Sequence, residues 1–537
     1  MLDLNAEQKK AAGHGEGPLL VVAGPGTGKT RVITQRIVHL LQEGASSGDE
    51  APLRPENILA LTFTEKAAEE MKRRVAAALP DLETPPFIST FHAFCLHILR
   101  KRHVDRLLLD KVDVWIFLRR RMAELGLEFY QKLAEPGAFL HDLNDFFSRC
   151  QDELIEPEDF EVYVRDCARR FSERHPRLAG VLAASQRSAD ALLGASAEEH
   201  LEWAEVLKKQ ELATVFRNSR RLIEEAGASS LGSLVSETVA LWKSLPEALA
   251  EARSRFRFVL VDEFQDTNYA QVELLKLLAG PPYRISAVGD DDQAIYRFRG
   301  ASHGAFEMFR QAFPGHSVVY LSQNYRSTQR ILRAASNVIQ QNDRYAQKPA
   351  LASSNVEGRR VYLLQSSSCA GEAAWIAEEV ERLARQGTPF ENMAVLYRAH
   401  HYRDPLVKEF RRRGVPFTIR GLSILSSTIL RDLTAWLRLA HSPHDNVSFT
   451  RALLAPRWRF PEALAQVIRK RATKERRSLY DVLKDDKTPE VEQQLAGTDW
   501  KKFEKLLRAL GKLGKSAPVT RLMDETIERL GWRYLPG

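Results

Sequence analysis

The sequence predicts an α/β fold with doubly wound parallel sheets, because short apolar runs alternate with helical patterns along much of the chain. Each run is bounded by Gly, Pro or polar residues, which is typical of a buried parallel strand. Helical patterns follow most of the runs, as the crossover connections of a parallel sheet require. The runs are PLLVVA (18–23), ILALTF (58–63), FRFVLV (256–261), RISAVG (284–289), VVYL (318–321) and MAVLY (393–397).

Two long segments interrupt the α/β pattern and divide the chain. Residues 105–235 have helical patterns with no convincing strand, and residues 427–537 are helical in pattern and basic. We therefore expect two α/β domains, each with a helical insertion. The first would comprise residues 1–104 and 236–316, and the second would comprise residues 317–426 and be incomplete.

The composition is that of an ordinary globular protein, with 44% hydrophobic and 28% charged residues among 537. No apolar run reaches the roughly 18 residues of a membrane span, and the N-terminus lacks the apolar core of a signal peptide. The four cysteines are scattered without metal-binding spacing, which favours reduced thiols and a cytoplasmic location.

The excess positive charge is confined to one region. Residues 451–537 hold 20 Lys+Arg against 12 Asp+Glu, which accounts for the whole formal net charge of +8. Such a region either binds a phosphate backbone or presents solvated helical faces.

A glycine-rich loop between the first apolar run and a helical pattern indicates a phosphate-binding site. Backbone N–H groups of such a loop converge on phosphates, and the N-terminus of the following helix adds its dipole. Lys29 would reach the β- and γ-phosphates, and the Thr30 hydroxyl would hold Mg²⁺. The strict pattern has Gly where this chain has Ala23, which is a small change. The predicted loop residues are Ala23, Gly24, Pro25, Gly26, Thr27, Gly28, Lys29 and Thr30.

An acidic pair follows the apolar run at 256–261. Asp262 is placed to bind Mg²⁺ directly or through water, and Glu263 is placed to polarise an attacking water. An Asp-Glu pair after a hydrophobic strand in a protein with a phosphate-binding loop predicts hydrolysis of a nucleoside triphosphate.

Eight motifs in a fixed order resemble those of the UvrD/Rep-type superfamily 1A DNA helicases over essentially the whole chain. They are LNAEQKKAA (4–12), AGPGTGKT (23–30), LTFTEKAAEEM (61–71), STFHAF (89–94), VDEFQDTN (261–268), VGDDDQAIYRFRGA (288–301), LSQNYRST (321–328) and AVLYRAH (394–400). The resemblance implies two RecA-like domains of the P-loop NTPase type, and ATP and Mg²⁺ as cofactors. It also implies 3′ to 5′ movement on single-stranded DNA, separation of duplexes at single-strand/double-strand junctions, and a role in DNA repair or recombination.

The same resemblance assigns roles at the nucleotide. Gln8 would read the adenine edge with Arg31 beside it, and Tyr325 would stack on the adenine. Arg326 would contact the γ-phosphate, and Gln293 would sense the γ-phosphate and the attacking water. The predicted catalytic residues are Lys29, Asp262, Glu263, Gln293 and Arg326.

For DNA, the resemblance implies stacking of bases on aromatic rings and contacts of phosphates with basic or hydroxyl groups. The segment 288–301 would face the nucleotide with its acidic half and DNA with its aromatic half, which would couple the two ligands. Core packing is an open alternative for Phe63 and Phe91, since aromatic residues at strand ends are commonly buried. The predicted DNA contacts are Phe63, Thr64, Lys66, Phe91, His92, Tyr296, Phe298 and Arg299.

The chain departs from the family in two places. GASSLGSLVSETVALW (227–242) stands where the family usually has an acidic helix. Two later motifs, one of which supplies a second arginine, do not occur in the 537 residues, and we interpret KERRSLYDVL (474–483) as an amphipathic helix start. We therefore expect the N-terminal part of a longer motor that binds ATP, hydrolyses it slowly and does not unwind duplexes, since an arginine finger is worth about 10³–10⁵ in rate.

Two alternatives stay open. The chain could be the motor portion of a RecB-like helicase–nuclease, or a DNA-binding ATPase homologue that does not hydrolyse ATP.

Overall fold

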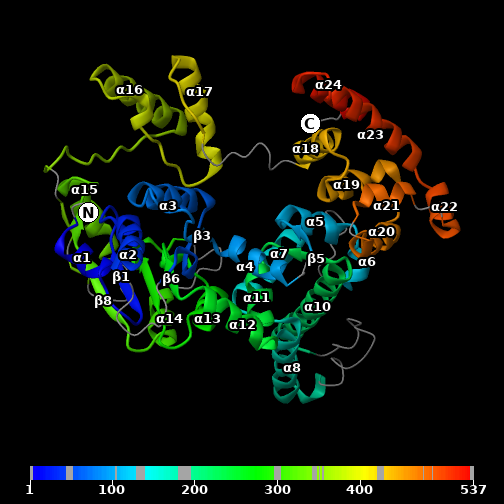
Figure 1. The fold of residues 1–537 in the computed structure, drawn as a ribbon, viewed down its shortest axis with the longest axis horizontal. Coiled ribbons are helices and arrows are strands. Elements are labelled where there is room, and N and C mark those ends of the chain that lie inside the picture. Colours follow the sequence, from blue (N-terminus) through cyan, green and yellow to red (C-terminus); the bar gives the residue numbers. More distant parts are fainter. Residues whose placement is uncertain are drawn as a thin grey trace. The chain divides into compact units, whose positions relative to one another are not determined.

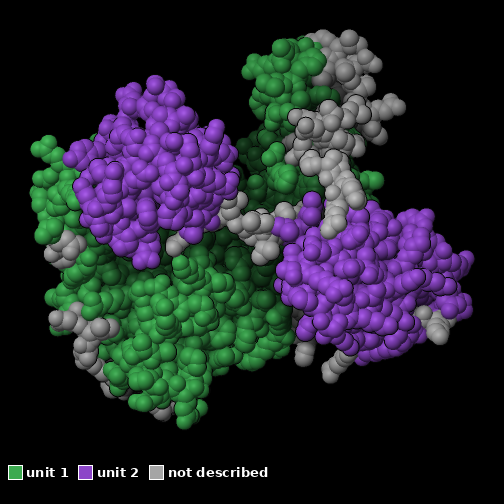
Figure 2. All heavy atoms as spheres, turned by 90° about the horizontal axis from the view of Figure 1, so that it is seen from above, with its two compact units in different colours: residues 1–361 green, residues 362–537 purple. Residues whose placement is uncertain are grey.

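The computed structural model of the chain has two compact units, residues 1–361 and 362–537, drawn in green and purple in Figure 2. Each unit is described by itself below. The structure describes residues 4–43, 53–102, 106–128, 139–178, 195–295, 304–341, 348–349, 351–353, 356–419, 428–475, 477–485 and 488–532.

The first unit is built on a six-stranded sheet in the order β3-β2-β6-β7-β1-β8, in which every neighbouring pair of strands is parallel (Figure 1). The carboxyl ends of all six strands therefore meet at one edge. The strands are β1 (Leu19–Ala23), β2 (Ile58–Thr62), β3 (Phe87–Thr90), β6 (Phe258–Val261), β7 (Ile285–Gly289) and β8 (Ser317–Leu321).

Helices cover both faces of this sheet, which confirms the doubly wound α/β prediction. Alternate strand residues point to opposite faces, so Leu20 and Val22 belong to one buried core while Leu19 and Val21 belong to the other. The helices around the sheet are α1 (Ala6–Ala12), α2 (Lys29–Glu43), α3 (Glu65–Ala78), α4 (Phe91–Lys101), α11 (Leu234–Ser244), α12 (Pro246–Arg255), α13 (Tyr269–Ala279) and α14 (Ala305–Ala312). A further helix, α15 (Gln329–Ile339), follows later in the first unit.

The segment between α4 and α11 is mainly helical, as predicted, and has its own apolar core with Phe147 stacked on Phe216. It also contains a short parallel strand pair, β4 (Leu107–Leu109) and β5 (Ala228–Ser230), so the expectation of no strand was wrong. Its described helices are α5 (Lys111–Arg119), α6 (Met122–Leu125), α7 (Phe139–Asp152), α8 (Pro157–Arg174) and α10 (Ala197–Glu225).

The boundary expected after residue 316 cuts off a strand of the first sheet. β8 pairs with β1 over Leu19–Ala23, so the run VVYL closes the first sheet rather than opening the second domain. The chain then forms β9 (Gln323–Asn324), α15 and β10 (Ala352–Ser353), and β10 returns to pair with β9. This segment from β9 to β10, residues 323–353, is called the excursion below, and it belongs to the first unit.

The second unit starts with α16 (Cys369–Arg385) and α17 (Arg403–Arg413), which share a small core around Ala377 and Phe410. The strand predicted at 393–397 is wrong, because the structure assigns no strand to the described residues after 361 and Leu396 is 94% exposed. Without a neighbouring ladder to pair with, an apolar run does not form a strand.

The rest of the second unit is helical, as predicted, and packs around Trp436, Phe449 and Phe503. Four apolar residues of α21, among them Tyr480 and Leu483, are buried, which confirms the amphipathic helix expected near 474–483. The helices are α18 (Thr428–His441), α19 (Asn446–Leu453), α20 (Glu462–Glu475), α21 (Leu479–Asp485), α22 (Pro489–Ala496), α23 (Trp500–Gly514) and α24 (Val519–Arg529).

Candidate functional site

The glycine-rich loop joins β1 to α2 at the carboxyl edge of the sheet. Gly26 and Gly28 have φ of +71° and +90°, a backbone region that other residues adopt only with strain. A Cβ on Gly26 would lie 2.6 Å from Arg326 Cβ, and one on Gly28 would lie 2.8 Å from Gln8 Nε2. Within the loop, Thr27 Oγ1 donates to the Gly24 carbonyl at 2.8 Å. The glycines are therefore required both by conformation and by close neighbours.

Gln8 holds the loop from α1. Its side chain is 1% exposed, Nε2 donates to the Thr27 carbonyl at 2.9 Å, and Oε1 accepts from the Asn5 backbone N–H at 3.2 Å. Both ends of the amide are thus engaged within the protein, and Gln8 lies beside the phosphate-binding loop. Its reading of the adenine edge stays a prediction.

The acidic pair lies opposite the start of α2. Lys29 Nζ is 2.8 Å from Glu263 Oε2, and Thr30 Oγ1 is 3.5 Å from Asp262 Oδ2. Glu263 has a φ of +50°, and its backbone N–H donates to Asp262 Oδ1 at 3.0 Å. The structure therefore brings together the four residues that the sequence predicted to act on phosphate, metal and water.

Asp262 is 5% exposed, and its burial, with the nearby charge of Glu263, raises its pKa from 3.8 to about 6. A buried carboxylate oxygen facing a threonine hydroxyl is a donor set that suits Mg²⁺, a hard cation that prefers oxygen ligands. Asp262 and Thr30 fit the ion, and they are the residues that would hold it.

A hydrogen-bonded chain connects Glu263 to the next strand end. Gln265 Nε2 donates to Glu263 Oε2 at 2.8 Å, and Gln265 Oε1 accepts from the Asp290 N–H at 2.9 Å. Asp290 Oδ2 in turn accepts from Gln293 Nε2 at 2.6 Å. Gln293 is thereby linked to the carboxylate of Glu263 through Asp290, by its side chain and its backbone N–H, and through the side chain of Gln265.

Lys348 adds a cation that sequence reasoning missed. Its ammonium lies 2.6 Å from Asp290 Oδ1 and 3.0 Å from Asp292 Oδ2, and it also pairs with Asp291. Among the described residues, these three aspartates are the group of acids close enough together to share a cation. No motif marks Lys348, because its partners are distant in the sequence, with Asp290 58 residues away.

The turn after β9 docks on the phosphate-binding loop. The Tyr325 N–H donates to the Gly26 carbonyl at 2.9 Å, and Asn324 Nδ2 donates to the Pro25 carbonyl. Asn324 Oδ1 also accepts from the Arg326 N–H at 2.9 Å, which fixes the turn. Tyr325 and Arg326 thus lie beside the loop, while their contacts with adenine and the γ-phosphate stay predictions. Asn324 is a second residue that sequence reasoning missed.

Arg31 lines a groove of about 640 Å³ between α2 and α3, with Thr34, Gln35 and Arg74. The groove lies one turn beyond the loop. Tyr325 is 45% exposed, and its hydroxyl accepts a hydrogen bond from Asn5 Nδ2 at 2.8 Å.

The predicted DNA contacts after β2 and β3 lie at the same sheet edge, since these strands are neighbours. Thr64 and Lys66 are exposed, and Phe63 is half-buried. Thr90 Oγ1 donates to Glu65 Oε1 at 2.7 Å, which ties the two segments together.

Phe91 and His92 differ from each other. His92 is exposed, whereas Phe91 is 3% exposed and lies in the apolar core with Phe94. The prediction that Phe91 stacks on a base is therefore corrected: its ring packs inside the unit, where α4 begins. The predicted contacts Tyr296, Phe298 and Arg299 lie outside the described residues.

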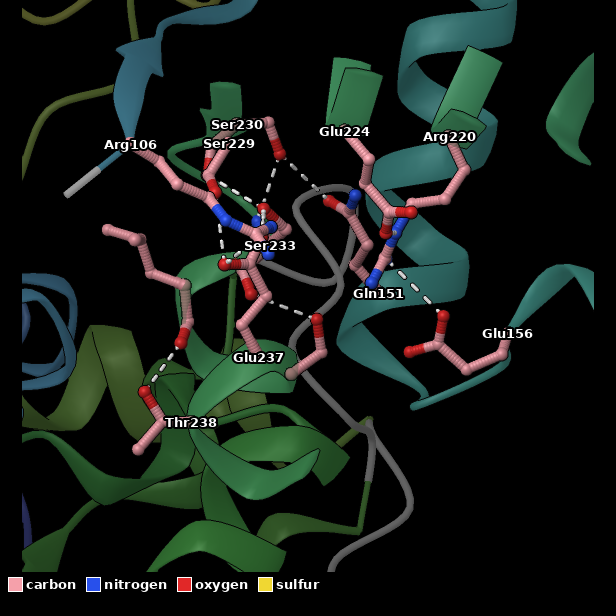
Figure 3. A network of polar contacts seen from close by, with 12 residues as sticks. Arg106, Gln151, Glu156, Arg220, Glu224, Ser229, Ser230, Ser233, Glu237 and Thr238 are labelled. Atoms are coloured by element: carbon pink, nitrogen blue, oxygen red, sulfur yellow. Dashed lines mark hydrogen bonds and ion pairs between the residues drawn. The ribbon is translucent and has the colours of Figure 1, made fainter. Parts of the chain in front are cut away.

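The segment 227–242, which lacks the family's usual acids, forms a polar network of its own at the base of the insertion (Figure 3). Glu237 accepts from Ser229 Oγ at 3.0 Å and from Ser233 Oγ at 2.7 Å, and Arg106 lies 3.7 Å away. The Ser233 N–H donates to Ser230 Oγ at 3.0 Å. These side chains bind one another and so join β5 to α11.

Comparison with known proteins bears on the same residues. The family model described as the UvrD/REP helicase N-terminal domain matches residues 4–314, and the UvrD-like helicase C-terminal domain matches residues 319–513. The chain belongs to the UvrD/Rep helicase family. The first match contains the phosphate-binding loop and the acidic pair.

Two curated relatives of this family member are named ATP-dependent DNA helicase PcrA. The protein from Staphylococcus aureus (strain Mu50) is 30% identical over 540 residues, and that from Staphylococcus epidermidis (strain RP62A) is 29% identical over 543 residues. Each alignment covers 99% of this chain but 66% of the relative, so the chain spans just under two thirds of their length. In the described part of the chain, no helix is long and apolar enough to cross a membrane.

Proposed function

We propose that this chain is the ATP-driven motor of a DNA helicase that moves 3′ to 5′ on single-stranded DNA. The helicase that it drives would open duplexes at single-strand/double-strand junctions, in the cytoplasm, during DNA repair or recombination. The observation that carries the proposal is the meeting of Lys29, Thr30, Asp262 and Glu263 under the turn that bears Arg326. The names of the two PcrA relatives support the same activity.

The ion pair between Lys29 and Glu263 suggests how the site responds to ATP. A γ-phosphate offers Lys29 a stronger anionic partner, and the exchange would release Glu263. The released carboxylate can then orient the attacking water and accept its proton as the water oxygen bonds to the γ-phosphorus. The bond from the γ-phosphorus to the β–γ bridging oxygen breaks in the same step, and ADP leaves with that oxygen. Arg326, on the docked turn, would stabilise the charge on the transferring phosphoryl group.

Mg²⁺ would be held by Thr30 and Asp262, and when bound it neutralises phosphate charge. The two protein oxygens are already 3.5 Å apart, so little rearrangement of side chains is needed. Gln293 would report the state of the γ-phosphate through its bond to Asp290.

DNA would bind along the same carboxyl edge, beyond β2 and β3. Exposed Thr64 and Lys66 offer a hydroxyl and a basic group to phosphates, and half-buried Phe63 offers part of a ring to a base. His92 offers a ring N–H, since desolvation lowers the pKa of its imidazole. Base stacking is worth about 1–3 kcal/mol and accepts any base, which suits a motor that reads no sequence. The contacts expected from Tyr296, Phe298 and Arg299 belong to this proposal.

The direction of travel is tested by displacement of streptavidin from single-stranded DNA labelled with biotin at one end. A 3′ to 5′ motor displaces streptavidin from the 5′ end in the presence of ATP and Mg²⁺, and we expect slow displacement from that end. Faster displacement from the 3′ end would contradict the proposed polarity. Nucleotide binding with no displacement from either end would favour a non-hydrolysing ATPase homologue.

A further inference from the structure

Lys348 is a buried cation shared by three carboxylates at the edge of the nucleotide site. Its side chain is 10% exposed, and the side chains of Asp290 and Asp292 are 1% and 22% exposed. The ammonium is within ion-pair distance of all three aspartates, so it fills the place among them that another cation would take. None of the family roles given above assigns it a function.

One carboxylate connects this cation to Gln293. Asp290 Oδ1 accepts from Lys348 at 2.6 Å, while Asp290 Oδ2 accepts from Gln293 Nε2 at 2.6 Å. The same residue is fixed through its backbone, because the Asp290 N–H donates to Gln265 Oε1 at 2.9 Å. The orientation of Gln293 therefore depends on the orientation of the Asp290 carboxylate. Lys348 helps to fix that orientation through its own bond to Asp290.

Lys348 belongs to the same segment of the chain as Arg326. Lys348 follows α15 on the excursion that starts at the Asn324–Arg326 turn and ends at β10. A Cβ on Gly24 would lie 2.8 Å from Leu351 Cδ1, so the end of the excursion also lies against the phosphate-binding loop. Lys348 thus joins the segment that bears Arg326 to the segment that bears Gln293.

Electrostatics favour a permanently charged ammonium at this place. Burial alone would lower the pKa of Lys348, but the charge of Asp290 and the hydrogen bonds that the ammonium donates to Asp290 and Asp291 outweigh burial and raise the pKa. Without the ammonium, three neighbouring carboxylates would repel one another, and the most buried of them is the partner of Gln293.

We propose that Lys348 is a positioning residue that holds Asp290 and, through it, Gln293 in the orientation that meets the γ-phosphate of ATP. This rests on the proposed function, because the γ-phosphate contact of Gln293 is part of that proposal. Lys348 itself touches neither nucleotide nor DNA in this account. Its removal is expected to affect nucleotides with a γ-phosphate and to spare ADP.

The test compares the affinities of the 537-residue chain for Mg²⁺–ADP and for fluorescent Mg²⁺–adenylyl-imidodiphosphate, a non-hydrolysable ATP analogue. Lys348→Met removes the charge at similar length, Lys348→Arg keeps it, and Gln293→Ala removes the positioned side chain. Lys276→Met is the matched control, since Lys276 is a 47% exposed lysine on α13 whose recorded partner is Glu273 at 3.5 Å. Melting temperatures of all variants are measured alongside.

Lys348→Met is expected to weaken analogue binding at least fivefold and ADP binding less than twofold, with no change in Lys276→Met. Combined with Gln293→Ala, it is expected to add less than a twofold loss, because the two residues act through one contact. Lys348→Arg is expected to keep at least a third of the wild-type affinity for the analogue. If Lys348→Met folds poorly, the affinity of Lys348→Arg still tests the positioning role.

Three results would overturn the positioning role. These are analogue binding by a folded Lys348→Met variant within twofold of wild type, full additivity with Gln293→Ala, and an equal loss in a folded Lys348→Arg variant. A wild-type chain that binds neither nucleotide, or a Lys29→Ala variant that binds both normally, would instead overturn the proposed function and the positioning role with it.

Discussion

Replacing the buried Asp262 with Asn is expected to stabilise the protein while abolishing its activity. Asp262 has a pKa of about 6 in the folded protein because of burial and the charge of Glu263, against an ordinary value of 3.8. The folded protein therefore binds a proton between about pH 4 and pH 6 that the unfolded chain does not bind. Stability due to this group is highest at low pH and is lost as the pH rises through about 6.

The magnitude follows from the difference between the two pKa values. At about 1.4 kcal/mol per pH unit, the ionised carboxylate costs the folded state up to about 3 kcal/mol at neutral pH. Asn carries no charge at any pH and avoids this cost. With about 2.1 cal/mol/K of unfolding entropy per residue over the 361 residues of the first unit, the gain corresponds to about 4 °C in melting temperature.

The assay is thermal unfolding of wild type and Asp262→Asn, without Mg²⁺ or nucleotide, at about pH 4.5 and about pH 7.5. The variant should melt higher by up to about 4 °C at the higher pH and by much less at the lower pH. Its ATPase activity should be lost at both, since the Mg²⁺ ligand is gone. A variant that melts no higher than wild type at about pH 7.5, or equally higher at both pH values, would show that the ionised Asp262 carboxylate does not destabilise the folded state.

Three other substitutions separate conformation, packing and nucleotide contact. Gly26→Ala should weaken ATP binding at least tenfold, because its Cβ would lie 2.6 Å from Arg326 Cβ. Gly17→Ala is the control, since Gly17 also has a positive φ, of +90°, but nothing within 4 Å, and it should leave ATP binding intact. Equal ATP affinities of the two variants in equilibrium titrations would contradict this. Phe91→Ala should lower the free energy of unfolding by about 3–5 kcal/mol in denaturant titrations, as for a core phenylalanine, and a loss of DNA affinity without loss of stability would restore the stacking prediction. Tyr325→Ala should weaken ATP binding about tenfold by equilibrium titration at an unchanged melting temperature, since the ring is 45% exposed; an unchanged affinity would remove Tyr325 from the adenine site.

Local sequence patterns predicted the first sheet and the phosphate-binding loop well. The runs that became β1 and β6 are almost wholly apolar because both faces of the sheet are covered, and glycine, lysine and threonine at the end of β1 have few other uses. Asp262 was predictable for the same reason, since it directly follows a buried strand.

Contacts between distant segments were not predictable in this way. Asn324 reaches a carbonyl 299 residues earlier, and Lys348 meets Asp290 58 residues earlier, so neither has a local pattern. Phe91 illustrates a different limit, because a one-residue change of register at the start of α4 decides whether a ring faces the core or the solvent. At 393–397 the apolar pattern was present, but among the described residues no strand pairs with it.

Whether hydrolysis takes place where Lys29 meets Glu263 is tested by the steady-state ATPase activity of the 537-residue chain with and without single-stranded DNA, beside Lys29→Ala and the control Lys276→Ala. We expect slow turnover that DNA increases, that Lys29→Ala abolishes and that Lys276→Ala leaves unchanged. Turnover that ignores both DNA and the loss of Lys29 would contradict this expectation, because hydrolysis would then occur somewhere other than the site where Lys29 meets Glu263.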